Sequence, residues 1–232
     1  NKMSISEDGI VKITKFFNND EVNKFVDELN FIISSEDVYN VQSNPKTDFN
    51  KLRRENKFVI NKRMKSRDGD EGMIDLWNYD QKMSEETKAL LNKINTHSIN
   101  ILREAYSDAG YDLKTHNVYL NKSVTETRGI HADSDFFPSR IKSFVYLTDV
   151  PDNSYGPFSY IKKSHIKEGL KYHRKYDIME PITDEDKENY KIYTGITSGD
   201  VVVAAVSGAH RGIPQEKGKM RMAIVSSYDP NN

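Results

Sequence analysis

Residues 200–228 read DVVVAAVSGAHRGIPQEKGKMRMAIVSSY, two apolar runs of strand length separated by a turn-rich segment. Three similar short runs precede it: KTHNVYLNK (114–122), RIKSFVYLTDV (140–150) and GPFSYI (156–161). Short apolar or alternating runs bounded by turn residues are typical of antiparallel strands. They show no strand–helix–strand rhythm and no glycine-rich phosphate loop, which argues against a nucleotide-binding α/β fold. The pattern predicts a mainly β protein, an antiparallel β-roll of two sheets.

Two helices are expected ahead of this β-roll. Asn19 and Asp20 precede an amphipathic run that predicts an N-capped helix, with apolar residues at helical spacing: Val22, Phe25, Val26, Leu29 and Ile32. A longer helix is predicted from a Ser84 cap to Gly110, again with one apolar stripe. These helices are expected to pack on the β-roll.

The remaining segments complete a single predicted domain, residues 1–232. GIVKITKFF (9–17) and KFVINKRM (57–64) predict strands, whereas residues 35–56 are polar and aperiodic and predict a loop. We therefore expect an N-terminal helical and strand cover over residues 1–110 and a β-core over 112–228. Within that core, residues 163–195 predict a polar, lid-like insertion, helical where residues 163–192 have any regular structure.

The composition excludes several classes of protein. The 232-residue chain has no cysteine, so disulfides, zinc–thiolate sites and thiol nucleophiles are excluded, and a metal would need His, Asp, Glu or backbone carbonyl ligands. A formal net charge of −1 argues against nucleic acid as a partner. No run approaches the ~20 apolar residues that span a bilayer, and the charged N-terminal residues have no apolar signal core. We expect a cytoplasmic protein without a membrane partner, and its oligomeric state stays open.

His131 and Asp133 are the first candidates for chemistry. A His-x-Asp pair is a weak signal by itself, and a surface turn is the ordinary explanation. Its weight comes from His210, which directly follows the apolar run VVVAAV and its short turn. Two imidazoles and one carboxylate on one face of an octahedral Fe(II) leave three positions open for a cosubstrate and O₂. The three residues therefore predict a metal site.

Arg221 lies inside the apolar strand KMRMAIVSSY (219–228). A buried arginine is costly without an anionic partner, and its planar fork suits a carboxylate such as the distal one of 2-oxoglutarate. A structural salt bridge for Arg221, or an edge position of its strand, is the alternative explanation.

Two segments then resemble a known family. They are IHADSDFFPSRIKSFVYLTDVPDNSYGPFSYIKKSH (130–165) and GDVVVAAVSGAHRGIPQEKGKMR (199–221). Together they resemble the phytanoyl-CoA dioxygenase-like branch of the iron(II)/2-oxoglutarate oxygenases. That branch has a His-x-Asp, a strand ending in "YLtDV", a "GPl…pgSHk" segment, a distal His after "GD" and an apolar strand, and an Arg about eleven residues later. The resemblance covers residues 115–228, about half of the chain.

The resemblance implies a double-stranded β-helix (a cupin-like jelly roll), Fe(II) ligated by His131, Asp133 and His210 as the catalytic centre, and 2-oxoglutarate bound by Arg221, with O₂ as co-reactant. Lys163 stands where the family usually has glycine, which changes a turn. Asp133 is retained, whereas halide-transferring relatives lose this carboxylate, so hydroxylation is favoured over halogenation.

Further contacts are less determined. Asn117 and Tyr119 share one face of a predicted strand, so either could hydrogen-bond the cosubstrate, or both could simply pack or face solvent. The loop after Asp133 should cross the pocket mouth, with Asp135 or Phe137 touching the substrate.

We therefore predict a 2-oxoglutarate-dependent dioxygenase that hydroxylates a small molecule and releases succinate and CO₂. Basic residues in 162–175 could attract an anionic substrate. One alternative is a non-redox, cupin-like metal-binding protein or isomerase, which would not need Arg221. The other is a nucleic-acid-directed oxygenase, which the basic run 51–67 favours and the net charge opposes.

Overall fold

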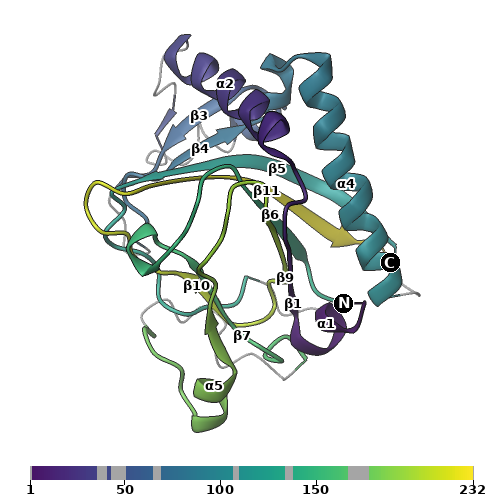
Figure 1. Cartoon of the computed structure of the whole chain (residues 1–232), viewed down its shortest axis with the longest axis vertical. Coiled ribbons are helices and arrows are strands. Elements are labelled where there is room, and N and C mark those ends of the chain that lie inside the picture. Colours follow the sequence, from purple (N-terminus) through teal and green to yellow (C-terminus); the bar gives the residue numbers. More distant parts are fainter. Residues whose placement is uncertain are drawn as a thin grey trace.

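A computed structural model describes residues 2–35, 41–42, 51–64, 69–106, 110–133, 138–166 and 178–231. Two sheets face each other, with helices on the outer face of the larger one (Figure 1). The predicted mainly β, two-sheet architecture with N-terminal helices is therefore confirmed.

The larger sheet has eight strands in the order β1-β9-β6-β11-β5-β4-β3-β2, and only the β2–β3 pair is parallel. Its strands are β1 (Ile10–Ile13), β2 (Val41–Gln42), β3 (Val59–Lys62), β4 (Ile74–Trp77), β5 (Tyr111–Lys122), β6 (Ile141–Tyr146), β9 (Val201–Ala205) and β11 (Met220–Pro230). The smaller sheet has the order β10-β7-β8, from β7 (Phe158–Ile161), β8 (Tyr190–Ile192) and β10 (His210–Gly212).

The helices are α1 (Lys2–Asp8), α2 (Asn19–Ser35), α4 (Glu85–Ala105) and α5 (Asp184–Asn189), with a helical turn at 51–54 and short 3₁₀ turns at Tyr79–Lys82 and Asn153–Tyr155. Figure 1 shows α2 and α4 over the larger sheet and α5 beside the smaller one. Phe25 and Leu29 of α2 and Leu102 of α4 are fully buried, in one cluster with outward-facing residues of β5 and β11. Burying each such side chain stabilises the fold by roughly 1.5–3 kcal/mol.

The helix starts follow local hydrogen bonding. Ser84 caps α4 as predicted, its side chain accepting from Thr87 N. The cap of α2 is Asn18, which precedes the Asn19–Asp20 pair from which an N-capped helix was expected. Asn18 Oδ1 accepts from Glu21 N (2.9 Å) while Glu21 Oε1 accepts from Asn18 N (3.1 Å), so a reciprocal capping box starts α2.

Three further expectations need correction. Residues 41–42 form β2 and residues 51–54 form a helical turn, so the predicted loop over 35–56 contains regular structure. Residues 190–192 form β8, which pairs with β7, so this part of the predicted helical, lid-like segment is a strand of the smaller sheet. Strands β1, β3 and β4 belong to the larger sheet, so the first 110 residues supply sheet as well as cover.

Glycine and polar residues shape the turns that lead to the site. Gly199 has φ +95° and lies so close to the Phe17 carbonyl that a side chain would overlap it. Its neighbour Asp200 is buried and accepts from Lys15 N (2.8 Å) and Thr197 N (2.9 Å). Lys163, which stands where the resembled pattern has glycine, has φ +66°, a left-handed conformation that glycine adopts more readily than lysine.

Candidate metal centre

Backbone hydrogen bonds place His131 opposite His210. His131 N donates to His210 O (3.0 Å), and His210 N donates to His131 O (2.9 Å). The ring centroids lie 4.6 Å apart. Asp133 N donates to Val206 O (2.8 Å), which fixes the carboxylate at the end of β9. The three predicted metal ligands thus come together through main-chain pairing.

The ligand atoms converge on one point. Atoms of His131, Asp133 and His210 that can bind a metal all lie within 4.8 Å of one another. The two Nε2 atoms lie 3.4 Å and 3.5 Å from the two Asp133 oxygens. Each Nδ1 contacts a backbone carbonyl, Gly129 O (2.7 Å) or Gly208 O (2.8 Å). A carbonyl can only accept, so Nδ1 carries the hydrogen and the lone pair on Nε2 points to the carboxylate, as a metal requires.

The charge states also suit a divalent metal. Burial lowers the pKa of His131 to about 4, so its imidazole is neutral near pH 7. Burial alone would raise the pKa of Asp133, but Lys142 and the two histidines hold it well below its ordinary value. Lys142 Nζ donates to Asp133 Oδ2 (2.9 Å), and although burial opposes it, this carboxylate raises the pKa of Lys142. A neutral imidazole and an ionised carboxylate fit an octahedral transition metal with open positions.

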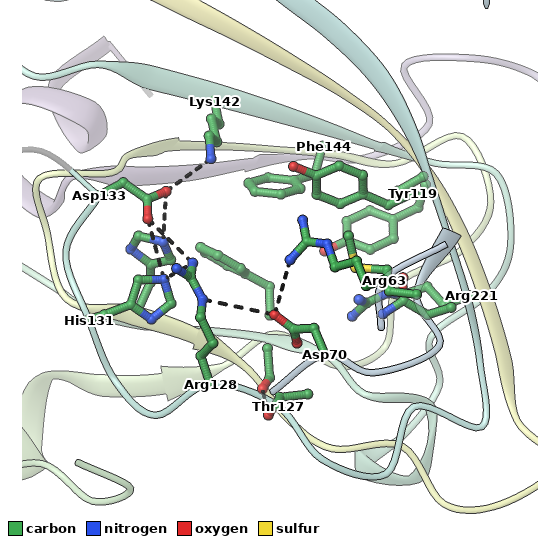
Figure 2. Close-up of a pocket in the computed structure, with 17 residues that line it drawn as sticks. Arg63, Asp70, Tyr119, Thr127, Arg128, His131, Asp133, Lys142, Phe144 and Arg221 are labelled. Carbon is green, nitrogen blue, oxygen red and sulfur yellow. Dashed lines mark hydrogen bonds and ion pairs between the residues drawn. The ribbon is translucent and has the colours of Figure 1, made fainter. Parts of the chain in front are cut away.

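The triad opens into a cavity of about 120 Å³ on the concave face of the larger sheet (Figure 2). Among the described residues, four cationic side chains line it: Arg63, Arg128, Lys142 and Arg221. The sequence predicted only Arg221 at this site. Its carboxylates are Asp70 and Asp133. The excess of positive charge favours an anionic ligand.

Arg221 lies in this cavity, as predicted. It lines the wall together with Tyr146 and Ala223, and its Nη1 donates to Gly156 O. In the part of the chain that the structure describes, Arg221 forms no ion pair. Burial lowers its pKa, which means that the charged form is poorly compensated. The structural salt bridge considered from the sequence is therefore absent among the described residues.

A carboxylate–arginine chain is the main feature that the sequence did not predict. Asp70 Oδ2 lies 3.4 Å from Arg63 Nη1 and 3.9 Å from Arg128 Nε, and Arg63 Nε donates to buried Asp75 (3.1 Å). Arg128 Nη2 continues the chain to Asp133 Oδ1 (3.5 Å) and contacts His131 Nε2. Burial raises the pKa of Asp70 against the effect of these arginines. The arginines thus link the cavity wall to the metal ligands.

The carboxylate–arginine chain depends on an unusual turn. Asp70 has φ +60°, and a side chain at preceding Gly69 (φ +78°) would meet the backbone of Thr127 and Arg128 at 2.8–3.0 Å. A non-glycine residue held in the left-handed region is strained, and such residues cluster at functional sites. The only sequence signals were the arginine inside the run 57–64 and the arginine three residues before His131.

The other residues predicted to contact the cosubstrate or the substrate do not all line the metal cavity. Tyr119 lines the cavity, and so does Asn121, two residues further along β5. Asn117 is buried but lines a neighbouring cavity instead. Asp135 and Phe137 lie outside the described residues.

No family model matches the sequence, nor does any curated protein. Solved structures do match. The non-heme α-ketoglutarate-dependent carbocyclase SnoK from nogalamycin biosynthesis superposes with a TM-score of 0.63 at 17% identity, over 98% of this chain and 81% of that one. HygX from Streptomyces hygroscopicus, crystallised with nickel and 2-oxoglutarate, gives 0.61 at 14%, over 98% and 84%. AviO1 from Streptomyces viridochromogenes gives 0.60 at 14%, over 98% and 92%.

At these identities the likeness establishes the fold, and the predicted double-stranded β-helix is confirmed. The phytanoyl-CoA dioxygenase-like resemblance stays a prediction. No helix in the described ranges is both long and apolar enough to cross a membrane.

Proposed function

We propose that this chain is an iron(II)- and 2-oxoglutarate-dependent oxygenase of the phytanoyl-CoA dioxygenase-like type. The observation that carries the proposal is the combination, in one cavity, of a two-histidine, one-carboxylate triad and an arginine that forms no ion pair with any described carboxylate. A metal-binding β-roll of another kind has no use for that arginine. A clamp for the distal carboxylate of 2-oxoglutarate accounts for it.

The residues divide the work as follows. His131, Asp133 and His210 would hold iron, which would supply O₂ activation and the oxidation of a C–H bond. Lys142 keeps Asp133 ionised and oriented. Arg221 would bind the distal carboxylate of 2-oxoglutarate at the other end of the cavity, with Tyr119 and Asn121 on the intervening wall.

Hydroxylation of a small molecule, with release of succinate and CO₂, is the proposed outcome, because the carboxylate ligand Asp133 is retained. The fold by itself does not select this outcome. Its solved relatives include a carbocyclase and an epimerase, SnoN, which was crystallised with Fe³⁺, α-ketoglutarate and nogalamycin RO. The proposed partner is likewise a small molecule, and the proposed location is the cytoplasm.

The test is anaerobic loading with Fe(II) and 2-oxoglutarate, followed by exposure to O₂ and a small-molecule library, with succinate as the readout. We expect one metal per chain and succinate release that Asp133→Ala abolishes. Asp27→Ala, at an exposed position on α2, is the matched control and should behave like the unchanged protein. Metal binding without any succinate release would instead support a non-redox metal protein.

A further inference from the structure

A second, larger cavity adjoins the metal cavity on the same concave face. Its volume is about 540 Å³, and Tyr119 and Lys142 line both cavities. Its floor comes from three neighbouring strands. Trp77 of β4 pairs with Asn117 of β5, and Ser227 of β11 pairs with Thr115 of β5. Side chains two residues apart on a strand share a face, so Asn117 continues the wall that Tyr119 begins.

The residues that line the second cavity are strongly basic. None of the described lining residues is a carboxylate. Five of the described lining residues are cationic: Arg53, Arg54, Lys114, Arg140 and Lys142. Two of these are matched by acids outside the lining, since Arg140 forms a bidentate pair with Asp229 (2.6 Å and 3.0 Å) and Lys142 pairs with Asp133. Arg54 forms no ion pair within the described ranges. Arg54 thus adds positive charge to the cavity that no carboxylate in the described ranges pairs with.

Two other features point to an organic ligand. The Arg53 guanidinium lies over the Trp77 ring, 5.0 Å from its centroid, so a cation–aromatic pair stands at the cavity wall. Asn117 is 3% exposed, and its Oδ1 has no hydrogen-bond partner among the described residues. A buried, unpaired amide oxygen is costly unless a ligand donates to it.

From these features we infer that the second cavity is the substrate chamber and that the substrate is a small organic anion. Its phosphate or carboxylate group binds at Arg53 and Arg54. Its body lies along Trp77, a hydroxyl or amino group donates to Asn117, and its far end passes Lys142 toward the triad. The role of this cavity as a substrate chamber rests on the proposed function, whereas its ability to bind an anion does not. Three arginines of the basic run 51–67 line these cavities: Arg53 and Arg54 line the second cavity, and Arg63 lines the metal cavity.

The chain offers a direct probe, because Trp77 is its single tryptophan. Tryptophan fluorescence of the metal-free protein would be titrated with phenyl phosphate, benzoate and benzyl alcohol, which share a ring and differ in the head group. We expect saturable changes with one or both anions and none with the alcohol. Comparing phenyl phosphate with benzoate then distinguishes a phosphate from a carboxylate head group.

Arg54→Gln should raise the Kd of the bound anion about tenfold, since it removes one charge-assisted contact at an exposed edge. Lys51→Gln is the matched control, because Lys51 is exposed in the same short segment and does not line the cavity. Its Kd should match that of the unchanged protein. Equal effects of the two variants, or tight binding of the alcohol, would overturn the inference.

Two controls separate this inference from the proposed function. Nickel and 2-oxoglutarate binding should be unchanged in Arg54→Gln. If Arg221→Gln, rather than Arg54→Gln, removes the fluorescence response, the anions occupy the metal cavity and the inference fails. If anions bind through Arg54 and no succinate is ever released, the anion site stands and the proposed reaction fails.

Discussion

Replacing Arg221 with glutamine should weaken 2-oxoglutarate binding without destabilising the free protein. The guanidinium donates to the Gly156 carbonyl, forms no ion pair among the described residues, and has a pKa that burial lowers even though Tyr146 and Asp70 attract its charge. Its charge therefore opposes folding in the absence of an anion. Glutamine removes that charge and can still donate a hydrogen bond, so the melting temperature should stay the same or rise slightly.

The expected loss of affinity follows from the kind of interaction removed. Truncating one partner of a buried, hydrogen-bonded charge pair costs ~2–5 kcal/mol, and because Arg221 is only partly buried we take the lower end, which is about a 30-fold increase in Kd. Arg221→Lys should recover only part of this, because an ammonium is a point charge and cannot form two parallel bonds to a carboxylate.

Calorimetric titration of nickel-loaded protein with 2-oxoglutarate measures the affinity, and a thermal melt of the metal-free protein measures stability. Arg103→Gln, at an exposed position on α4, is the control and should change neither. A melting temperature lower by several degrees together with an unchanged Kd would refute the reasoning, because it would make Arg221 a structural residue.

Three further predictions concern the surroundings of the site. Asp75→Asn should lower the free energy of unfolding by ~2–3 kcal/mol in urea titrations, because it leaves Arg63 without its most buried partner. Gly199→Ala should be at least ~2 kcal/mol more destabilising than Gly72→Ala, since both have positive φ but only Gly199 meets backbone; equal urea midpoints would contradict this. Arg128→Gln should tighten nickel binding in the absence of 2-oxoglutarate about 3–10-fold by calorimetry, because it removes a cation beside the ligand atoms; weaker binding would show that Arg128 supports the metal site instead.

The sequence predicted those strands whose own residues carry the pattern. β5, β6, β9 and β11 contain long apolar or alternating runs and were all expected. β10 is only His-Arg-Gly and β8 only Tyr-Lys-Ile, so neither has a pattern, and both are strands because each pairs with β7. Their formation depends on tertiary contacts, which the local sequence pattern does not reveal.

The same division holds at the candidate site. The triad was predictable because its residue types and order are specific. Arg63, Asp70 and Arg128 were not, because they meet only where the left-handed turn at Asp70 packs against the chain just before His131. Asn117 shares the face of β5 with Tyr119, as expected, but lines only the second cavity, since the period of a strand fixes a side chain's face and not the cavity above it.

The arrangement along β6 explains how one concave face can serve two anions at once. Lys142, Phe144 and Tyr146 point to the same side, and four residues of strand span ~13 Å. Tyr146 lines the same end of the metal cavity as Arg221, whereas Lys142 lines both the metal cavity and the second cavity. Asp133, paired with Lys142, therefore stands at the junction of the two cavities. A carboxylate bound at Arg221 and an anion bound at Arg54 would approach the triad from opposite ends, so each can be long enough to reach the metal without competing for the other's cations.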